Sequence, residues 1–155
     1  TLCEPVTSGV EKVKQAMIDK HVALLADAAE KGVEVVCMQE LFYGPYFCAE
    51  QDPKWYDLTE RVPDGPTTKL MMDIAKKHKM VIVVPMYEED LPGVYYNSAS
   101  VIDAPSPAPD STSVSTVPCS SVAQPFRPEA KITGKSSCAS VACSLSNRSK
   151  VALMT

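Results

Sequence analysis

Several features that would define a function class at once are missing from this 155-residue sequence. It has no unbroken apolar run of about 18 residues, the length that a membrane-spanning helix requires. Its first five residues show neither the basic start nor the apolar core of a secretory signal. The formal net charge of −4 argues against a dedicated nucleic-acid binder. We therefore expect neither a membrane partner nor a nucleic-acid partner.

Metal-binding spacings are also missing. The sequence has six cysteines and only two histidines, with no Cys-x-x-Cys pair and no histidine at the spacing of a zinc site. Because no secretion signal accompanies them, the cysteines are interpreted as reduced thiols. The sequence therefore predicts a cytoplasmic protein without a metal site.

The composition changes near residue 103. Residues 1–103 carry a net charge of −7 and residues 104–155 a net charge of +3. The second part holds 12 of the 15 serines but only one of the ten aromatic residues. Such a segment buries too little apolar surface to offset a backbone entropy of roughly 1–2 kcal/mol per residue. We expect a folded part over 1–103, followed over 104–155 by a Ser/Thr/Pro-rich tail that is disordered or out of frame.

Hydrophobic periodicity predicts two helices in the first part. Apolar side chains recur at three- and four-residue steps over 10–28, with Ser8 as the predicted N-cap and Gly32 as the glycine that ends the helix. A second helix is predicted to begin at Pro66, where the missing N–H of proline costs little, and to continue to His78. Both histidines, His21 and His78, are predicted to lie at the edge of the core.

Three apolar runs, at 33–38, 80–85 and 94–102, predict buried strands. The order of helix, strand, long loop, helix, strand and strand is typical of an α/β domain with helices on a central sheet.

Glu40 follows the first predicted strand, and active sites of open α/β sheets lie beyond the carboxyl ends of strands. The loop over 41–48 is rich in aromatic residues, so we expect it to cover a pocket. A carboxylate beneath this loop would be desolvated, which would raise its pKa toward the range of a general base. The alternative is that Glu40 pairs with a basic side chain or caps a backbone amide.

Several blocks, in the right order, resemble the nitrilase superfamily of carbon–nitrogen hydrolases over about residues 8–103. The block 37–48 is similar to the first catalytic motif, and the resemblance continues through 62–68, 83–88 and 93–98. These blocks look most like the branch of β-ureidopropionase and other N-carbamoyl amidohydrolases. The resemblance implies a four-layer αββα sandwich, of which this α/β chain would form the N-terminal portion.

The resemblance also implies a chemistry. In this family a Glu acts as the general base for a cysteine nucleophile, and a Lys stabilises the tetrahedral intermediate. The implied substrate is a small ureido or amide compound, such as N-carbamoyl-β-alanine, which gives β-alanine, CO2 and ammonia without a cofactor. The resemblance further implies a homo-oligomer for a full-length relative.

Only Glu40 of this Cys–Glu–Lys site is carried onto the sequence. Gly134-Lys135 shares two letters with the Lys motif but lacks the basic residues that follow it, and no buried strand leads into Cys138 or Cys143. We therefore expect this chain to be inactive alone. The alternative is a truncated, non-catalytic homologue that binds or regulates a full-length hydrolase.

Three further residues fall within the resembling blocks. Tyr46 is similar to a pocket-lining position and is the candidate substrate-binding residue, with packing under the loop as an equal alternative. Glu88 is interpreted as a structural residue or a support for the site, although it could also belong to a solvated acidic turn. Cys48 is interpreted as a small buried hydrophobic residue and not as the nucleophile.

Overall fold

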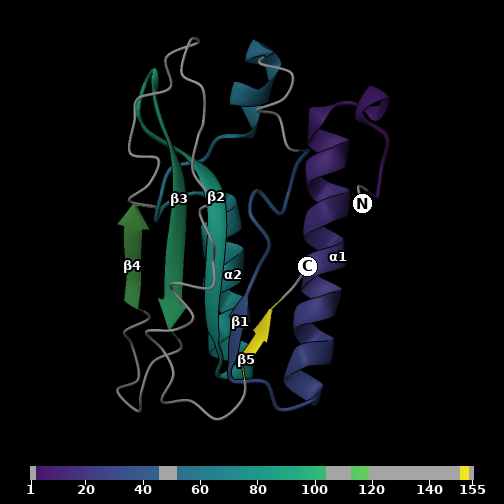
Figure 1. The fold of residues 1–155 in the computed structure, drawn as a ribbon, viewed down its shortest axis with the longest axis vertical. Helices are drawn as coiled ribbons and strands as arrows, with labels where there is room; N and C mark the ends of the chain where they lie inside the picture. Colours follow the sequence, from purple (N-terminus) through teal and green to yellow (C-terminus); the bar gives the residue numbers. More distant parts are fainter. Residues whose placement is uncertain (1–2, 46–51, 104–112, 119–150, 154–155) are drawn as a thin grey trace.

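The computed structural model describes residues 3–45, 52–103, 113–118 and 151–153 (Figure 1). The predicted order of helix, strand, long loop, helix, strand and strand is confirmed. In chain order the elements are η1 (Val6–Ser8), α1 (Val10–Glu30), β1 (Val35–Cys37), η3 (Pro53–Leu58), α2 (Pro66–His78), β2 (Val81–Leu91), β3 (Val94–Asp103), β4 (Ser113–Pro118) and β5 (Val151–Leu153), where η marks a 3-10 helix.

The strands form one mixed sheet in the order β4-β3-β2-β1-β5. β1 runs parallel to β2, with Val35 opposite Val81 and Cys37 opposite Val83, and α2 makes the connection between them. β2 and β3 form an antiparallel hairpin, whose turn contains Gly93 at a φ of 82°. Parallel neighbours require such a helical crossover, whereas antiparallel neighbours need only a turn, so the connections follow from the strand directions.

One helical layer covers the sheet. α2 contacts β2 and β3, and α1 contacts α2 and η3. Side chains of both helices share a core with alternate residues of the central strands, and burying a side chain such as Leu25 completely contributes roughly 1.5–3 kcal/mol. This core includes Ile18 and Leu25 of α1, Met71 and Ile74 of α2, and Ile82, Val84 and Met86 of β2. The arrangement corresponds to the helix and sheet layers expected of part of an αββα sandwich.

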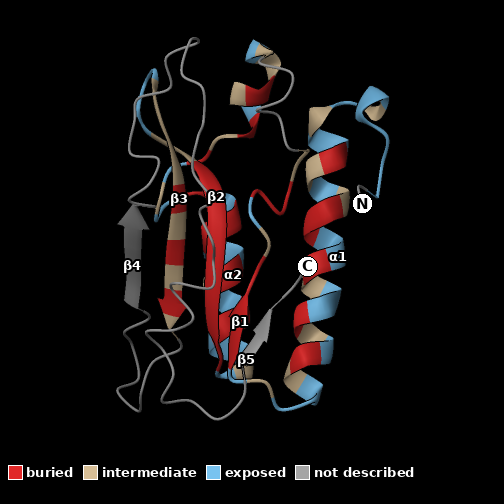
Figure 2. Ribbon diagram, in the orientation of Figure 1, coloured by how far each residue is buried: buried red, intermediate tan, exposed pale blue. Residues whose placement is uncertain are grey.

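The central strands are buried on their second face as well. Val35, Cys37, Val81 and Val83 are at most 1% exposed, although they do not belong to the core beneath the helices. Figure 2 shows β1 and most of β2 as buried along their length. Burial on both faces explains why these strands are continuous apolar runs in the sequence instead of alternating patterns.

The two ends of α1 give different outcomes for the sequence predictions. Gly32 ends the helix as predicted: its φ is 71°, its N–H donates to the Ala29 carbonyl, and the next N–H donates to the Ala28 carbonyl. The N-cap prediction is wrong. Gly9 takes that position with a φ of 97°, and the Ser8 hydroxyl donates instead to Glu4 in the turn before the helix.

The strand lengths also differ from the predicted ones. β1 is shorter than 33–38, whereas β2 continues beyond residue 85 to Leu91. The hairpin explains the extension, because its pairing runs from Ile82↔Ile102 to Leu91↔Val94 and satisfies backbone groups whatever the side chains are.

Two short segments of the predicted tail, Ser113–Pro118 and Val151–Leu153, are strands in the described structure. β4 pairs antiparallel with β3, and β5 pairs parallel with β1. Edge strands present unpaired N–H and C=O groups that an extended segment can pair with through its backbone, and the Ser, Thr and Val content of β4 suits a strand. The rest of the predicted tail lies outside the described residues, and the domain boundary at residue 103 stays a prediction. In the described ranges, no helix combines the length and apolarity needed to cross a bilayer.

Candidate active site around Glu40

Glu40 lies just beyond the carboxyl end of β1, where the sequence predicts it. The Met38 N–H donates to the Val83 carbonyl at 3.1 Å, which continues the pairing of β1 with β2 toward Glu40. The following residue, Leu41, has a φ of 51°, a left-handed conformation that is uncommon for a side chain other than glycine. At this turn Leu41 is buried, whereas Glu40 is exposed.

The Glu40 carboxylate is held by Asn97 of β3. The Asn97 Nδ2 donates to Glu40 Oε1 at 2.6 Å, a charge-assisted hydrogen bond between segments far apart in the sequence. Ser98, Ser100 and Ile102 of β3 are buried, and Ile102 belongs to the core beneath the helices. Because side chains alternate along a strand, Asn97 and with it the Glu40 carboxylate lie at the opposite face of the sheet.

This contact bears on the alternatives that the sequence left open. Within residues 3–45, 52–103, 113–118 and 151–153, Asn97 is the one hydrogen-bond partner of the Glu40 carboxylate, and neither a basic side chain nor a backbone amide contacts it. A neutral amide orients a carboxylate without neutralising it. The catalytic role of Glu40 stays a prediction. The structure adds that the hydrogen bond from Asn97 orients the Glu40 carboxylate.

The expectation that the aromatic loop covers Glu40 is wrong for its described part. Phe42 and Tyr43 are 0% and 1% exposed, and both belong to the core between helices and sheet. Phe42 packs edge-to-face on His21 of α1, with ring centroids 5.1 Å apart. Burial of these large rings in the core is more favourable than their use as a cover, so Glu40 remains exposed. Tyr46 and Cys48 lie outside the described residues.

Glu88 lies within β2 and not in a solvated turn. It is half-buried and accepts a hydrogen bond from the hydroxyl of Ser98 on β3. Its backbone also forms an isolated parallel bridge with Glu60. These contacts join β2 to β3 and to the segment before α2, which favours the structural interpretation of Glu88 over the solvated acidic turn.

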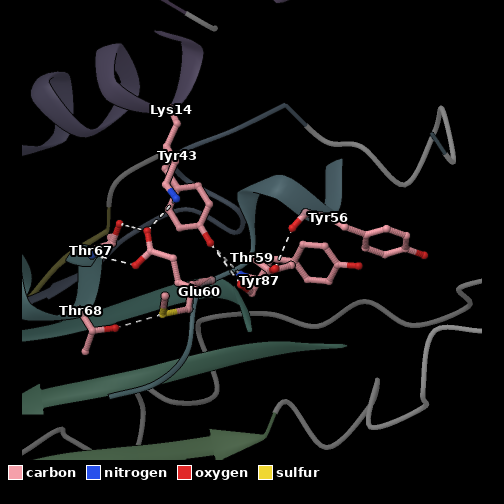
Figure 3. A network of polar contacts seen from close by, with 9 residues as sticks. Lys14, Tyr43, Tyr56, Thr59, Glu60, Thr67, Thr68 and Tyr87 are labelled. Atoms are coloured by element: carbon pink, nitrogen blue, oxygen red, sulfur yellow. Dashed lines mark hydrogen bonds and ion pairs between the residues drawn. The ribbon is translucent and has the colours of Figure 1, made fainter. Parts of the chain in front are cut away.

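A buried network around Glu60, absent from the sequence predictions, lies between the helices and β2 (Figure 3). Lys14 Nζ of α1 is 2.7 Å from Glu60 Oε1, and the side chains of these two residues are 12% and 4% exposed. Thr67 donates its N–H to Oε2 at 2.8 Å and its hydroxyl to Oε1 at 2.5 Å. The carboxylate thus satisfies an N–H at the first turn of α2, where the helix dipole favours negative charge.

Tyr43 connects this network to β2. Its hydroxyl donates to the Tyr87 carbonyl at 3.3 Å and accepts from the Tyr87 N–H at 3.2 Å. The Lys14 ammonium lies 5.1 Å from the centroid of the Tyr43 ring. Burial raises the pKa of Tyr43, and the negative charge of Glu60 raises it further. The hydroxyl therefore keeps its proton at neutral pH and remains a donor.

The only sequence signal for this network is a carboxylate shortly before the predicted start of α2. A carboxylate at that place is a suitable acceptor for the free N–H groups of a helix start. The partner Lys14 could not be predicted from the sequence. It lies on α1, and both β1 and η3 stand between α1 and Glu60 along the chain, so only the packing of the folded protein brings the two residues together.

Both histidines lie near the core as predicted. His21 is 3% exposed and its Nδ1 is 2.7 Å from the Met17 carbonyl, so this nitrogen carries the proton. Burial lowers the pKa of His21, partly opposed by this hydrogen bond, and the charge of Lys20 lowers it further. His78 is half-buried at the end of α2. Over the described ranges, no three His, Cys, Asp or Glu side chains are grouped to hold a metal ion.

Curated relatives match between about half and two-thirds of the chain. β-Ureidopropionase of Arabidopsis thaliana is 32% identical over 100 residues, which cover 63% of this chain and 24% of that protein. N-carbamoylputrescine amidase of Solanum lycopersicum is 37% identical over 81 residues, which cover 52% of this chain and 27% of that protein. The chain therefore spans about a quarter of the length of these relatives.

The same part of the chain is similar to a solved structure. The carbon–nitrogen hydrolase from Helicobacter pylori G27 matches with a TM-score of 0.53 at 29% identity, covering 58% of this chain and 31% of that chain. The sequence profile described as carbon–nitrogen hydrolase matches residues 7–113, which include Glu40, Asn97 and the beginning of β4. Because this profile matches residues 7–113, which are more than half of the chain, the chain belongs to the carbon–nitrogen hydrolase family of the nitrilase superfamily.

Proposed function

We propose that this chain supplies the general base of a carbon–nitrogen hydrolase that acts on an N-carbamoyl amino acid or amine. The observation that carries the proposal is the hydrogen bond from Asn97 to Glu40 at the carboxyl end of β1. The names of the two relatives support the substrate class, since one is named for a ureido compound and the other for an N-carbamoyl compound. Substrates on this proposal are compounds such as N-carbamoyl-β-alanine and N-carbamoylputrescine.

The two carboxylate oxygens of Glu40 have different roles in this proposal. Oε1 accepts from Asn97, which leaves Oε2 to receive a proton from a cysteine thiol. The thiolate attacks the carbamoyl carbon, the amine leaves with a proton, and water hydrolyses the carbamoyl thioester to CO2 and ammonia. The exposure of Glu40 supports this role, because a general base must be reachable by the group that it deprotonates.

The remaining elements of the proposal follow the family resemblance. This chain lacks the family motifs that carry the cysteine nucleophile and the lysine that stabilises the tetrahedral intermediate. The 155-residue chain is therefore inactive alone. Tyr46 lines the substrate pocket, and Glu88 supports the site from β2. The complete hydrolase is a cytoplasmic homo-oligomer that needs no cofactor.

The test joins residues 1–103 to the remainder of the Arabidopsis β-ureidopropionase that follows its matched segment. Ammonia release from N-carbamoyl-β-alanine and N-carbamoylputrescine is measured for the 155-residue chain and for the joined protein. We expect no release by the chain alone and release by the joined protein. Substituting Glu40→Gln in the joined protein is expected to lower kcat by about 10²–10⁴-fold, the usual contribution of a general base.

Asp73→Asn is the matched control, because it removes the carboxylate of an exposed residue of α2 and leaves Glu40 unchanged. We expect it to retain most of the kcat. Activity of the unjoined chain would reject its proposed inactivity. A folded but inactive joined protein would reject the hydrolase proposal and favour a non-catalytic partner of a full-length hydrolase.

A further inference from the structure

Tyr87 of β2 is contacted by two residues that approach it from different elements. The hydroxyl of Tyr43 binds both its backbone N–H and its backbone carbonyl, at 3.2 and 3.3 Å. On the other side, Asn97 of β3 is its direct partner in the antiparallel register. One residue of the sheet therefore fixes the relative positions of the Tyr43 side chain and of Asn97.

Glu40 is connected to both of these residues. Its carboxylate accepts from Asn97 at 2.6 Å, and its backbone precedes Tyr43 by three residues, across the left-handed turn at Leu41. These contacts close a ring that runs from Glu40 along the chain to Tyr43, through the Tyr87 backbone to Asn97, and back to the carboxylate. Such a ring restrains the backbone and the side chain of Glu40 at the same time.

The Tyr43 side chain is itself held firmly. The ring is buried beneath the Lys14 ammonium, and Lys14 is paired with Glu60. The Glu60 N–H also donates to the Tyr87 carbonyl at 3.1 Å, so the acceptor of the Tyr43 hydroxyl is fixed by a second donor (Figure 3). The hydroxyl contributes little to the solvent-exposed surface, which leaves its bond to β2 as its evident use.

We propose that Tyr43 is a positioning residue for Glu40: its hydroxyl anchors the segment after Glu40 to the backbone of Tyr87, and thereby brings the carboxylate to the Asn97 amide. This inference rests on the proposed function only for the statement that Glu40 is the base. The geometric part, that Tyr43 controls the contact between Glu40 and Asn97, is independent of any activity.

The test uses the full 155-residue chain and nuclear magnetic resonance of the Asn97 side-chain amide. Glu40→Gln removes the charge that accepts from this amide, so it changes the amide chemical shift. The same substitution is then made in a Tyr43→Phe background, which deletes only the hydroxyl. We expect the shift change caused by Glu40→Gln to shrink at least about twofold in that background, because losing one net hydrogen bond alters the paired population several-fold.

Thr68→Val is the matched control, since it deletes a buried hydroxyl that contacts Met86 and leaves Tyr43 untouched. Under the proposal, Glu40→Gln changes the chemical shift of the Asn97 amide as much in the Thr68→Val background as in the otherwise unsubstituted chain. An undiminished shift change in Tyr43→Phe, with a lowered thermal midpoint, would overturn the proposal and leave the hydroxyl a purely stabilising role.

If Tyr43→Phe does not fold in buffer, the spectra are recorded in trimethylamine N-oxide, which strengthens apolar burial. A diminished shift change under these conditions supports the positioning role, and an undiminished one rejects it. Failure of the hydrolase assay together with a diminished shift change in Tyr43→Phe would reject the proposed function and retain the positioning role of Tyr43. An undiminished shift change in Tyr43→Phe together with an active hydrolase would reject the positioning role alone.

Discussion

Lys14 of α1 and Glu60 before α2 form an ion pair of 2.7 Å in which both side chains are almost completely buried. Neither charge is fully solvated, so each depends on the other and on the hydrogen bonds from Thr67. This pair ties the first helix to the start of the second and to the end of β2, since the Glu60 backbone also pairs with Tyr87 and Glu89.

Breaking the Lys14–Glu60 pair from one side is expected to be costly. Lys14→Met leaves the Glu60 charge buried without its cation, which should lower the free energy of unfolding by about 3–5 kcal/mol. The double variant Lys14→Met/Glu60→Gln removes both charges and keeps an acceptor for Thr67, so it should recover part of that loss. Denaturant unfolding of the single and double variants measures both effects, and additive losses would contradict the coupling.

Gly65 has no space for a side chain. A Cβ added there would lie 2.6 Å from the Arg61 carbonyl oxygen and 2.7 Å from Glu60 Oε2. Gly65→Ala should therefore destabilise the protein by about 1–3 kcal/mol, because backbone and a buried carboxylate must move. Gly44→Ala is the control: its Cβ would meet Leu58 Cδ1, the end of a side chain and not backbone, at 2.9 Å, and it should cost less. Thermal unfolding compares the two, and equal losses would argue against the steric explanation.

The elements that the sequence predicted well are those with local causes. The apolar stripe of α1, its end at Gly32 and the start of α2 at Pro66 each depend on residues within one or two helical turns. The buried strands were predictable for the same reason, because both faces of β1 and β2 are apolar. The position of Glu40 after β1 followed from this local pattern.

The features that the sequence did not predict depend on contacts between distant segments. β5 pairs with β1 through its backbone, to which a hydrophobic pattern gives no guide. Glu60 meets Lys14 only after the helices pack together. The exposure of Glu40 depends on whether Phe42 and Tyr43 turn toward the core or over the carboxylate, and residue type alone does not determine that choice.

His21 should make stability depend on pH in the acidic range. Burial holds its pKa below the ordinary value of 6.5 in the folded protein, whereas the unfolded chain has the ordinary value. As the pH falls through about 6.5 and toward the lower folded pKa, the unfolded state binds a proton that the folded state does not, so the free energy of unfolding decreases. His21→Gln should reduce this slope. Denaturant unfolding at pH 5.5 and 7.5 (about one unit on either side of the ordinary pKa) measures it, and an unchanged slope would exclude His21 as the cause.

Tyr43 should make the free energy of unfolding decrease as the pH rises in the alkaline range, whereas His21 makes it decrease as the pH falls. Burial and the Glu60 charge raise its pKa in the folded protein above the ordinary value of 10.0. When the pH rises through that ordinary value, the unfolded state releases the phenolic proton while the folded state retains it, so stability falls. Tyr43→Phe should be less stable at neutral pH by about 1–3 kcal/mol, because the Tyr87 N–H loses its buried acceptor, yet it should lose less on going to high pH. Unfolding curves at neutral and alkaline pH test both parts, and a parallel decline of the two proteins above pH about 10 would show that Tyr43 ionises normally.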